Sequence, residues 1–216
     1  NLTPYSIWLA TVVVSGISYL SYLLKRYVFH ESGVLVSGII GGLYSSTATI
    51  SVLARKSRKA SAQEANEYVA AMLLAVSMMF LRFMILILIF SREIFMSIYP
   101  YLLIMSVVAA VVAWFIHSRQ RRSKDLSADS EEEDSSNPLE FKVALIFATL
   151  FVIFTVLTHY TLVYAGTGGL NLLSFVSGLS DITPFILNLL QNTGSVAVLI
   201  VVACSMQAII SNILVN

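Results

Sequence analysis

Apolar runs of about twenty residues recur along this chain of 216 residues, and few charged side chains lie inside them. A helix needs roughly 20 apolar residues to cross the ~30 Å hydrocarbon core of a bilayer. Only 12% of the residues are charged, whereas an average soluble domain has about 25%. The short alternating segments of a membrane β-barrel are absent from the sequence. The sequence therefore predicts an all-α, polytopic membrane protein.

Seven segments are predicted as transmembrane helices. They are residues 5–24, 34–53, 68–90, 94–116, 141–164, 170–190 and 196–215. Residues 118–138 change from a basic to an acidic run with almost no apolar side chain, so we expect a disordered, solvated linker there. The single cysteine, Cys204, excludes an internal disulfide and a cysteine-built metal site. The chain does not begin with Met, and we expect it to be a fragment of something longer.

Two polar stretches, residues 41–49 and 177–184, interrupt the apolar runs and resemble each other. An offset of 136 residues aligns Gly42 with Gly178 and Ser45 with Asp181. We therefore predict two parallel three-helix repeats, joined by the fourth span and the linker. In these terms residues 1–216 are a single membrane domain. Its parts are the first repeat (1–92), a connecting helix (93–117), the disordered charged cytoplasmic linker (118–138) and the second repeat (139–216).

Basic residues give the expected orientation. Four of them follow the second predicted span and four follow the fourth: Arg55, Lys56, Arg58 and Lys59, and then Arg119, Arg121, Arg122 and Lys124. The excess of Lys and Arg in cytoplasmic loops places both loops in the cytoplasm. With seven spans, the N-terminus is then cytoplasmic. Lys25 and Arg26 disagree with this arrangement, because they fall in a loop on the outer side.

Asp181 lies near the middle of the predicted span 170–190. An ionised carboxylate at that depth costs about 2.5–3.5 kcal/mol or more, and such residues mark ion or proton paths. Gly178 and Pro184 suit a broken helix, because Pro184 removes a backbone donor. Carboxylate, hydroxyl and carbonyl oxygens are the ligands that hard cations prefer. We predict an ion pathway between the second and sixth spans, with Asp181 as the metal ligand. Its lining residues are Ser45, Ser46, Thr47, Thr49, Ser180, Asp181, Thr183 and Asn188.

Arg82 is the other charged residue inside a predicted span. Two interpretations stay open: the side chain reaches the outer interface, or it acts as a counter-charge to Asp181 or as an electrostatic gate. Gln207 and Asn212 in the last span are secondary pore-lining candidates. Ser and Thr also serve close contacts between membrane helices, so packing is the alternative function of residues 45–49.

Several motifs resemble the C-terminal multi-helix domain of MgtC/SapB-type bacterial membrane proteins. They are Gly41-Gly42-Leu43-Tyr44-Ser45-Ser46-Thr47-Ala48-Thr49, Leu53-Ala54-Arg55-Lys56-Ser57, Met79-Phe80-Leu81-Arg82, Asn137-Pro138-Leu139-Glu140, Ser177-Gly178-Leu179-Ser180-Asp181 and Ser211-Asn212. That domain usually has a second acid two residues after the first, and here the position is Thr183. The resemblance implies a multi-pass protein in the inner (plasma) membrane of a prokaryote. It implies no activity, and the association with MgtC only suggests a link to magnesium or to membrane energetics.

We therefore expect an ion channel or transporter for cations. No Walker loop, His-Glu-x-x-His or Gly-x-Ser-x-Gly motif is present, and we do not expect an enzyme. No cofactor is expected except a bound monovalent or divalent cation, and the expected partners are membrane lipids, an inorganic cation and a second copy in a homodimer, but no nucleic acid. The alternative is a non-transporting regulatory or interaction protein, with a dry interface at residues 45–49 where a transporter would have a water-accessible path.

Overall fold

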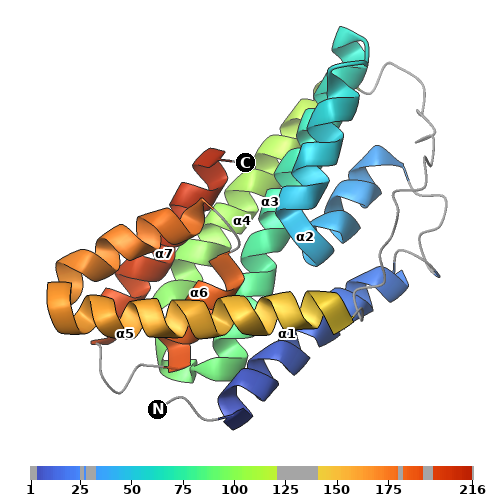
Figure 1. Cartoon of the computed structure of the whole chain (residues 1–216). Helices are drawn as coiled ribbons and strands as arrows, with labels where there is room; N and C mark the ends of the chain where they lie inside the picture. The colour runs from blue at the N-terminus through green and yellow to red at the C-terminus, as the bar shows by residue number, and fades with distance from the viewer. Residues whose placement is uncertain are drawn as a thin grey trace. The chain divides into compact units, whose positions relative to one another are not determined.

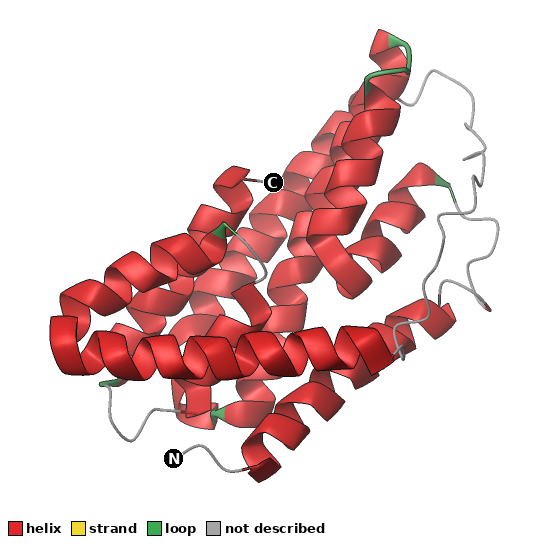
Figure 2. Cartoon of the chain, in the orientation of Figure 1, coloured by secondary structure: helices red, strands yellow, loops and turns green. Residues whose placement is uncertain are grey.

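The computed structural model describes residues 4–24, 27, 33–120, 141–179, 182–191 and 197–215, and the elements in this part are helices (Figure 2). The seven helices are α1 (Pro4–Leu23), α2 (Val34–Ser57), α3 (Ala62–Phe90), α4 (Arg92–Gln120), α5 (Phe141–Gly178), α6 (Ile182–Gln191) and α7 (Val198–Val215). Five of them, α2, α3, α4, α5 and α7, have the length and composition to cross a membrane. Shorter apolar stretches lie in α1 and α6. The described part of the chain is thus all-helical, and its long apolar helices are those of a membrane protein.

The helices agree with several predicted spans and differ from others. α1, α3, α4 and α7 each contain one predicted span, allowing for one or two residues at the ends. α4 continues to Gln120, so residues 118–120 are helical and do not belong to a disordered linker. The rest of the predicted linker lies outside the described residues. The predicted spans 34–53 and 170–190 are not single straight helices, as shown below.

The chain divides into two compact units. One unit contains Asn1–Ser15, Met84–Tyr99 and Leu139–Asn216, and the other contains Gly16–Phe83 and Pro100–Pro138. We call the first the C-terminal unit, because it contains the end of the chain. We call the second the α2–α3 unit, because it contains α2 and most of α3. Each is described by itself.

α2 bends sharply at Ser45, whose backbone angles (φ −155°, ψ 105°) are extended. A Cβ atom built on Gly41 would lie 2.5 Å from Thr49 Oγ1, although eight residues of straight helix span about 12 Å. Val34 and Leu53 pack in one apolar cluster with Ala71 of α3, although nineteen residues of straight helix would separate them by about 28 Å. Figure 1 shows the same change of direction between the lighter-blue and cyan parts of α2. α2 is therefore a helical hairpin.

We call residues 34–44 the first limb of this hairpin and residues 46–57 the second limb. Gly38 lies against Ala71, and Gly42 lies against Ala75. The residue numbers of the contacting pairs increase in the same direction in both helices, so the first limb runs parallel to α3. The second limb is antiparallel to both and is joined to α3 by a short turn. In this turn Ser61 and Glu64 exchange hydrogen bonds of 2.9 and 3.4 Å, which caps the start of α3.

α3 and α4 are joined in the α2–α3 unit by a pair of buried serines. Ser77 Oγ donates to the carbonyl of Ser106 at 3.0 Å, and Ser106 Oγ donates to the carbonyl of Ser77 at 3.2 Å. Hydroxyl pairs of this kind hold membrane helices together, because lipid offers their polar atoms no other partner.

In the C-terminal unit, α5 bends at Gly166, which has a positive φ of 59°. Glycine is suited to this conformation because it has no Cβ atom. The bend separates a long apolar part of α5 from residues 167–178, which we call the returning segment. α6 follows, and all of its residues from Ile182 to Leu190 are buried. α6 packs on α5 and α7, and Phe154 of α5 meets Phe185 of α6 edge to face at 5.7 Å.

Candidate functional site

The bend of α2 carries the first predicted polar stretch. Ser45 Oγ accepts a hydrogen bond of 3.4 Å from the backbone N–H of Ala48, which caps the start of the second limb. Ser46 is buried, Ser45 and Thr49 are half-buried, and Thr47 is exposed. Ser and Thr side chains compete with the hydrogen bonds of a helix. In α2 these residues lie at the bend, where the first limb ends and the second begins.

Arg82 of α3 reaches this bend. Its Nη1 donates a hydrogen bond of 2.9 Å to the carbonyl oxygen of Tyr44, the last residue of the first limb. The carboxyl end of a helix has a partial negative charge and carbonyls that lack helical partners. The guanidinium group of Arg82 is positively charged and donates hydrogen bonds, so it can compensate this negative charge and bind one of these carbonyls. One contact of Arg82 is therefore with the backbone of α2, and its predicted role as a counter-charge to Asp181 or as a gate stays a prediction.

Replacing Arg82 by methionine is expected to lower the free energy of unfolding by about 1–3 kcal/mol, because a charged donor is lost from a carbonyl in an apolar environment. The measurement is thermal unfolding of the purified protein in detergent. Arg82→Lys is the matched control, since it keeps the charge and a donor, and it should lose less. Equal melting temperatures for Arg82→Met and the wild type would contradict this assignment.

Two glycines of the first limb make close contacts with α3. A Cβ atom on Gly42 would lie 2.5 Å from Ala75 Cα, and one on Gly38 would overlap the backbone of Ala71. The signal was present in the sequence, because glycines four residues apart form the small-residue pattern of close membrane-helix contacts. These glycines supply a close contact between the first limb and α3, and the packing role of residues 45–49 stays the alternative prediction.

The returning segment lies along α7 in the C-terminal unit. Cys204 Sγ donates to Asn171 Oδ1 at 3.4 Å, and Ser211 Oγ donates to the carbonyl of Phe175 at 2.9 Å. Both numbers rise together, so the two helices are parallel. A Cβ atom on Gly178 would overlap the side chain of Ser211. This geometry repeats that of the first limb on α3.

The carbonyl end of the returning segment also receives a side-chain donor. Asn212 Nδ2 donates to the carbonyl oxygen of Gly178 at 3.0 Å, and Asn212 is buried. The predicted pore-lining residue Asn212 thus binds the end of a helix, as Arg82 does at the bend of α2. Gln207, the other candidate in this helix, is half-buried.

Further polar residues lie inside the C-terminal unit. Asn188 of α6 is buried and donates to Thr155 Oγ1 of α5, and Thr183 is buried in the same helix. Pro184 stands in the first turn of α6, where its missing N–H costs no helical hydrogen bond. The buried hydroxyls of Thr158 and Ser205 have no hydrogen-bond partner in the described part of the chain. Thr155, Thr158 and Ser205 were not predicted as site residues, because a single Ser or Thr side chain in an apolar run gives by itself no signal.

Ser180 and Asp181 lie outside the described residues. The described chain stops at Leu179, directly after the end of the returning segment, and resumes at Ile182. The predicted interruption of residues 170–190 is therefore confirmed by two separate helices, and the predicted role of Asp181 stays a prediction. The predicted pathway between the second and sixth spans also stays a prediction.

Comparison with known proteins gives a family and one distant relative. The family model described as "Domain of unknown function (DUF4010)" matches residues 12–216. A protein of Aquifex aeolicus (strain VF5), named "Uncharacterized protein", is 25% identical over 181 residues, which cover 83% of this chain and 77% of the relative. No solved structure matches the chain. Neither description mentions MgtC or SapB, so that relationship stays an expectation.

Proposed function

We propose that this chain, which belongs to the DUF4010 family, moves a cation across a membrane. The description of the family assigns no activity. The proposal is carried by one structural observation: helices are interrupted inside apolar segments, once at Ser45 and once after Gly178, where α5 ends.

Interrupted helices are costly in a bilayer. No water in the hydrocarbon core satisfies the freed backbone groups, so non-helical backbone is tolerated only where protein buries it or where it lines a water-filled cavity. Transporters use such interruptions, because freed carbonyls and the ends of half-helices coordinate ions and polar substrates. The two interruptions of this chain therefore support transport more strongly than the presence of Ser and Thr alone.

The sign of the transported charge follows from the acid. Asp181 is the acidic residue well inside an apolar run, and it follows the returning segment by three positions. A carboxylate supplies the negative charge that a cation needs near the middle of a bilayer. The bend of α2 offers only neutral oxygens, and Arg82 places a positive charge beside it. We therefore assign the cation to Asp181, and we assign a lining role to Ser45, Ser46, Thr47 and Thr49.

An internal repeat is part of the proposal. Gly42 lies against Ala75, and Gly178 lies against Ser211. The same offset of 136 residues that aligns the polar stretches carries the first pair onto the second. A packing contact that recurs at one offset supports two copies of one unit.

The test is ion flux into liposomes that contain the purified chain. The panel is K⁺, Na⁺, Mg²⁺, Ca²⁺ and Zn²⁺, with protein-free liposomes as the blank. We expect uptake of at least one of these cations above the blank. Absence of flux for the whole panel, with the protein correctly folded in the liposomes, would overturn the proposal and favour the non-transporting regulatory protein.

A further inference from the structure

We propose that α2 and the stretch from Thr167 to Ala197 are re-entrant segments that enter the membrane from opposite sides. The chain then crosses the membrane five times, through α1, α3, α4, the long part of α5, and α7. This topology does not depend on the proposed transport activity.

The contacts of α2 require that it enters and leaves on the same side. Its limbs meet at Gly41 and Thr49 near the bend, and Val34 and Leu53 near their ends share one apolar cluster with Ala71 of α3. Gly41 and Thr49 each lie four residues from Ser45, and the cluster joins residues near the two ends of α2, so these ends lie close together. A helix that crossed the membrane would have its ends about 30 Å apart.

The depth of the bend follows from the length of the limbs. Val34–Tyr44 and Ser46–Ser57 are about 16 and 18 Å long at 1.5 Å per residue. This is about half of the ~30 Å core. The hairpin therefore brings Ser45, Ser46 and Thr47 to mid-membrane depth, where Arg82 of the crossing helix α3 meets it.

The second re-entrant segment follows from the register between the returning segment and α7. Asn171 contacts Cys204. About two helical turns later in both helices, Gly178 contacts Asn212. Since these helices are parallel, α7 begins at the end of the unit where the returning segment begins. The chain between Gly178 and Val198, which includes the buried α6, must therefore come back to the side from which it entered.

The number of membrane crossings then determines on which side of the membrane each loop lies. If α2 does not cross, residues 24–33 lie on the same side as residues 58–61, and the long part of α5 carries the chain to the other side before the second re-entrant segment. The first repeat begins on one side and the second begins on the other, so the repeat is inverted. The parallel repeat of the sequence analysis depended on α2 and residues 170–190 each crossing the membrane. Inverted repeats with interrupted helices are a common construction of secondary transporters.

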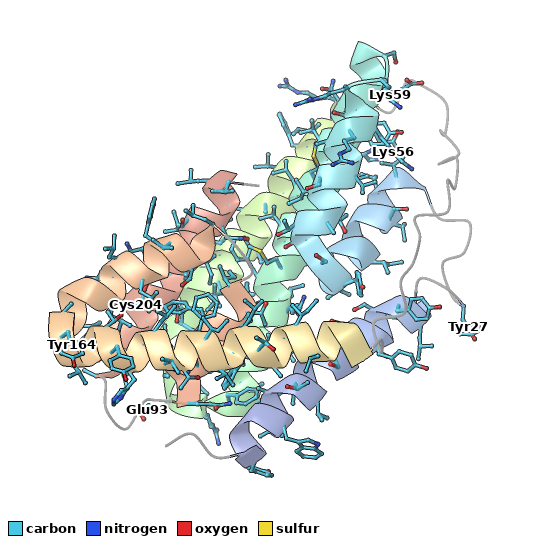
Figure 3. The ribbon with its side chains drawn as sticks, in the orientation of Figure 1. Tyr27, Lys56, Lys59, Glu93, Tyr164 and Cys204 are labelled. Atoms are coloured by element: carbon cyan, nitrogen blue, oxygen red, sulfur yellow. The ribbon has the colours of Figure 1, made fainter. Side chains whose placement is uncertain are left out.

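The charges agree with this count. Lys25 and Arg26 join the other basic loops on one side, which removes the disagreement found in the sequence. Of the 13 Lys and Arg residues, Arg82 lies inside a span and Arg92 is the one residue placed opposite the rest. Figure 3 shows Lys56 and Lys59 at the end of the second limb, next to the turn into α3. The excess of Lys and Arg makes this the cytoplasmic side, so the N-terminus lies outside.

The experiment is cysteine labelling in spheroplasts with a membrane-impermeant maleimide. Cys204→Ser removes the single native cysteine, and one cysteine is then introduced at Tyr5, Gly33, Ala60, Glu93, Thr167 or Ala197. Five crossings predict labelling from outside at Tyr5, Glu93, Thr167 and Ala197, and protection of Gly33 and Ala60 until the cells are lysed.

Seven crossings predict the same result at Ala60, Glu93 and Thr167, which serve as matched controls. They predict the reverse at the other three positions. External labelling of Gly33 with protection of Tyr5 would overturn the α2 assignment, and protection of Ala197 would overturn the second one. Labelling of Ala60 and Glu93 from the same side would overturn both, because α3 would then not cross. Flux in liposomes is unaffected by these outcomes, so a failure of this topology and a failure of the proposed function are distinguishable.

Discussion

Asp181→Asn is expected to reduce cation flux about a hundredfold while leaving the protein folded. Asparagine has nearly the same shape as aspartate but no charge, so the cation loses its compensating carboxylate. An unpaired charge near the bilayer centre costs about 2.5–3.5 kcal/mol, and each 1.4 kcal/mol corresponds to a tenfold change in an equilibrium constant. The measurement is the initial rate of uptake into liposomes of the cation that the panel identifies.

A matched change at another carboxylate separates this effect from a general loss of negative charge. Glu93 is exposed in the first turn of α4, outside the middle of any span. Glu93→Gln should leave the flux within about twofold of the wild type, because water and salt screen the charge of an exposed carboxylate. If Asp181→Asn and Glu93→Gln give the same rate, Asp181 is not the cation ligand. Folding is checked for both variants by their elution as a single species in detergent.

Gly42→Ala is expected to lower the free energy of unfolding by about 1–3 kcal/mol. The added methyl group would lie 2.5 Å from Ala75 Cα and 2.7 Å from the Ala75 carbonyl oxygen. These are backbone atoms of α3, which cannot rotate away as the end of a side chain can. The first limb must therefore move off α3. The readout is the apparent melting temperature in detergent.

Gly16→Ala is the control, because glycine 16 is also helical but has nothing within 4 Å of an added Cβ. There the substitution should be neutral or stabilising by up to about 1 kcal/mol, the difference in helix propensity between the two residues. The two substitutions thus have opposite expected signs. A Gly42→Ala protein as stable as the Gly16→Ala protein would mean that the first limb does not pack on α3 as described.

The sequence predicted the interruption after Gly178 but not the bend at Ser45, where residues 34–53 were predicted as one crossing helix, although the cause of both is local. Ser45 stands among hydroxyl residues that compete with helical hydrogen bonds, and Gly178 precedes a polar pair and Pro184. The direction of the chain after each interruption was not accessible. A crossing helix and a hairpin of two half-length limbs have the same apolar composition, so a hydropathy pattern fits both.

The hydrogen-bond partners of Arg82 and Asn212 likewise could not be predicted from the sequence, although the two residues themselves could. Sequence identifies a guanidinium and a carboxamide inside apolar runs as residues that need partners. Their partners are the backbone carbonyls of Tyr44 and Gly178, and a carbonyl has no sequence signature. Only the packing of α3 on α2 and of α7 on the returning segment brings these donors to those acceptors.

By itself the sequence determined that this is a helical membrane protein, that the apolar run 170–190 is interrupted, and where polar residues stand inside the apolar runs. The length, apolar composition and helix-breaking chemistry of a segment are properties of the segment alone. The tertiary structure alone decided that α2 turns back and that the returning segment runs parallel to α7. Both depend on glycines meeting the backbone or side chains of another helix, and such contacts exist only between segments, after they have packed.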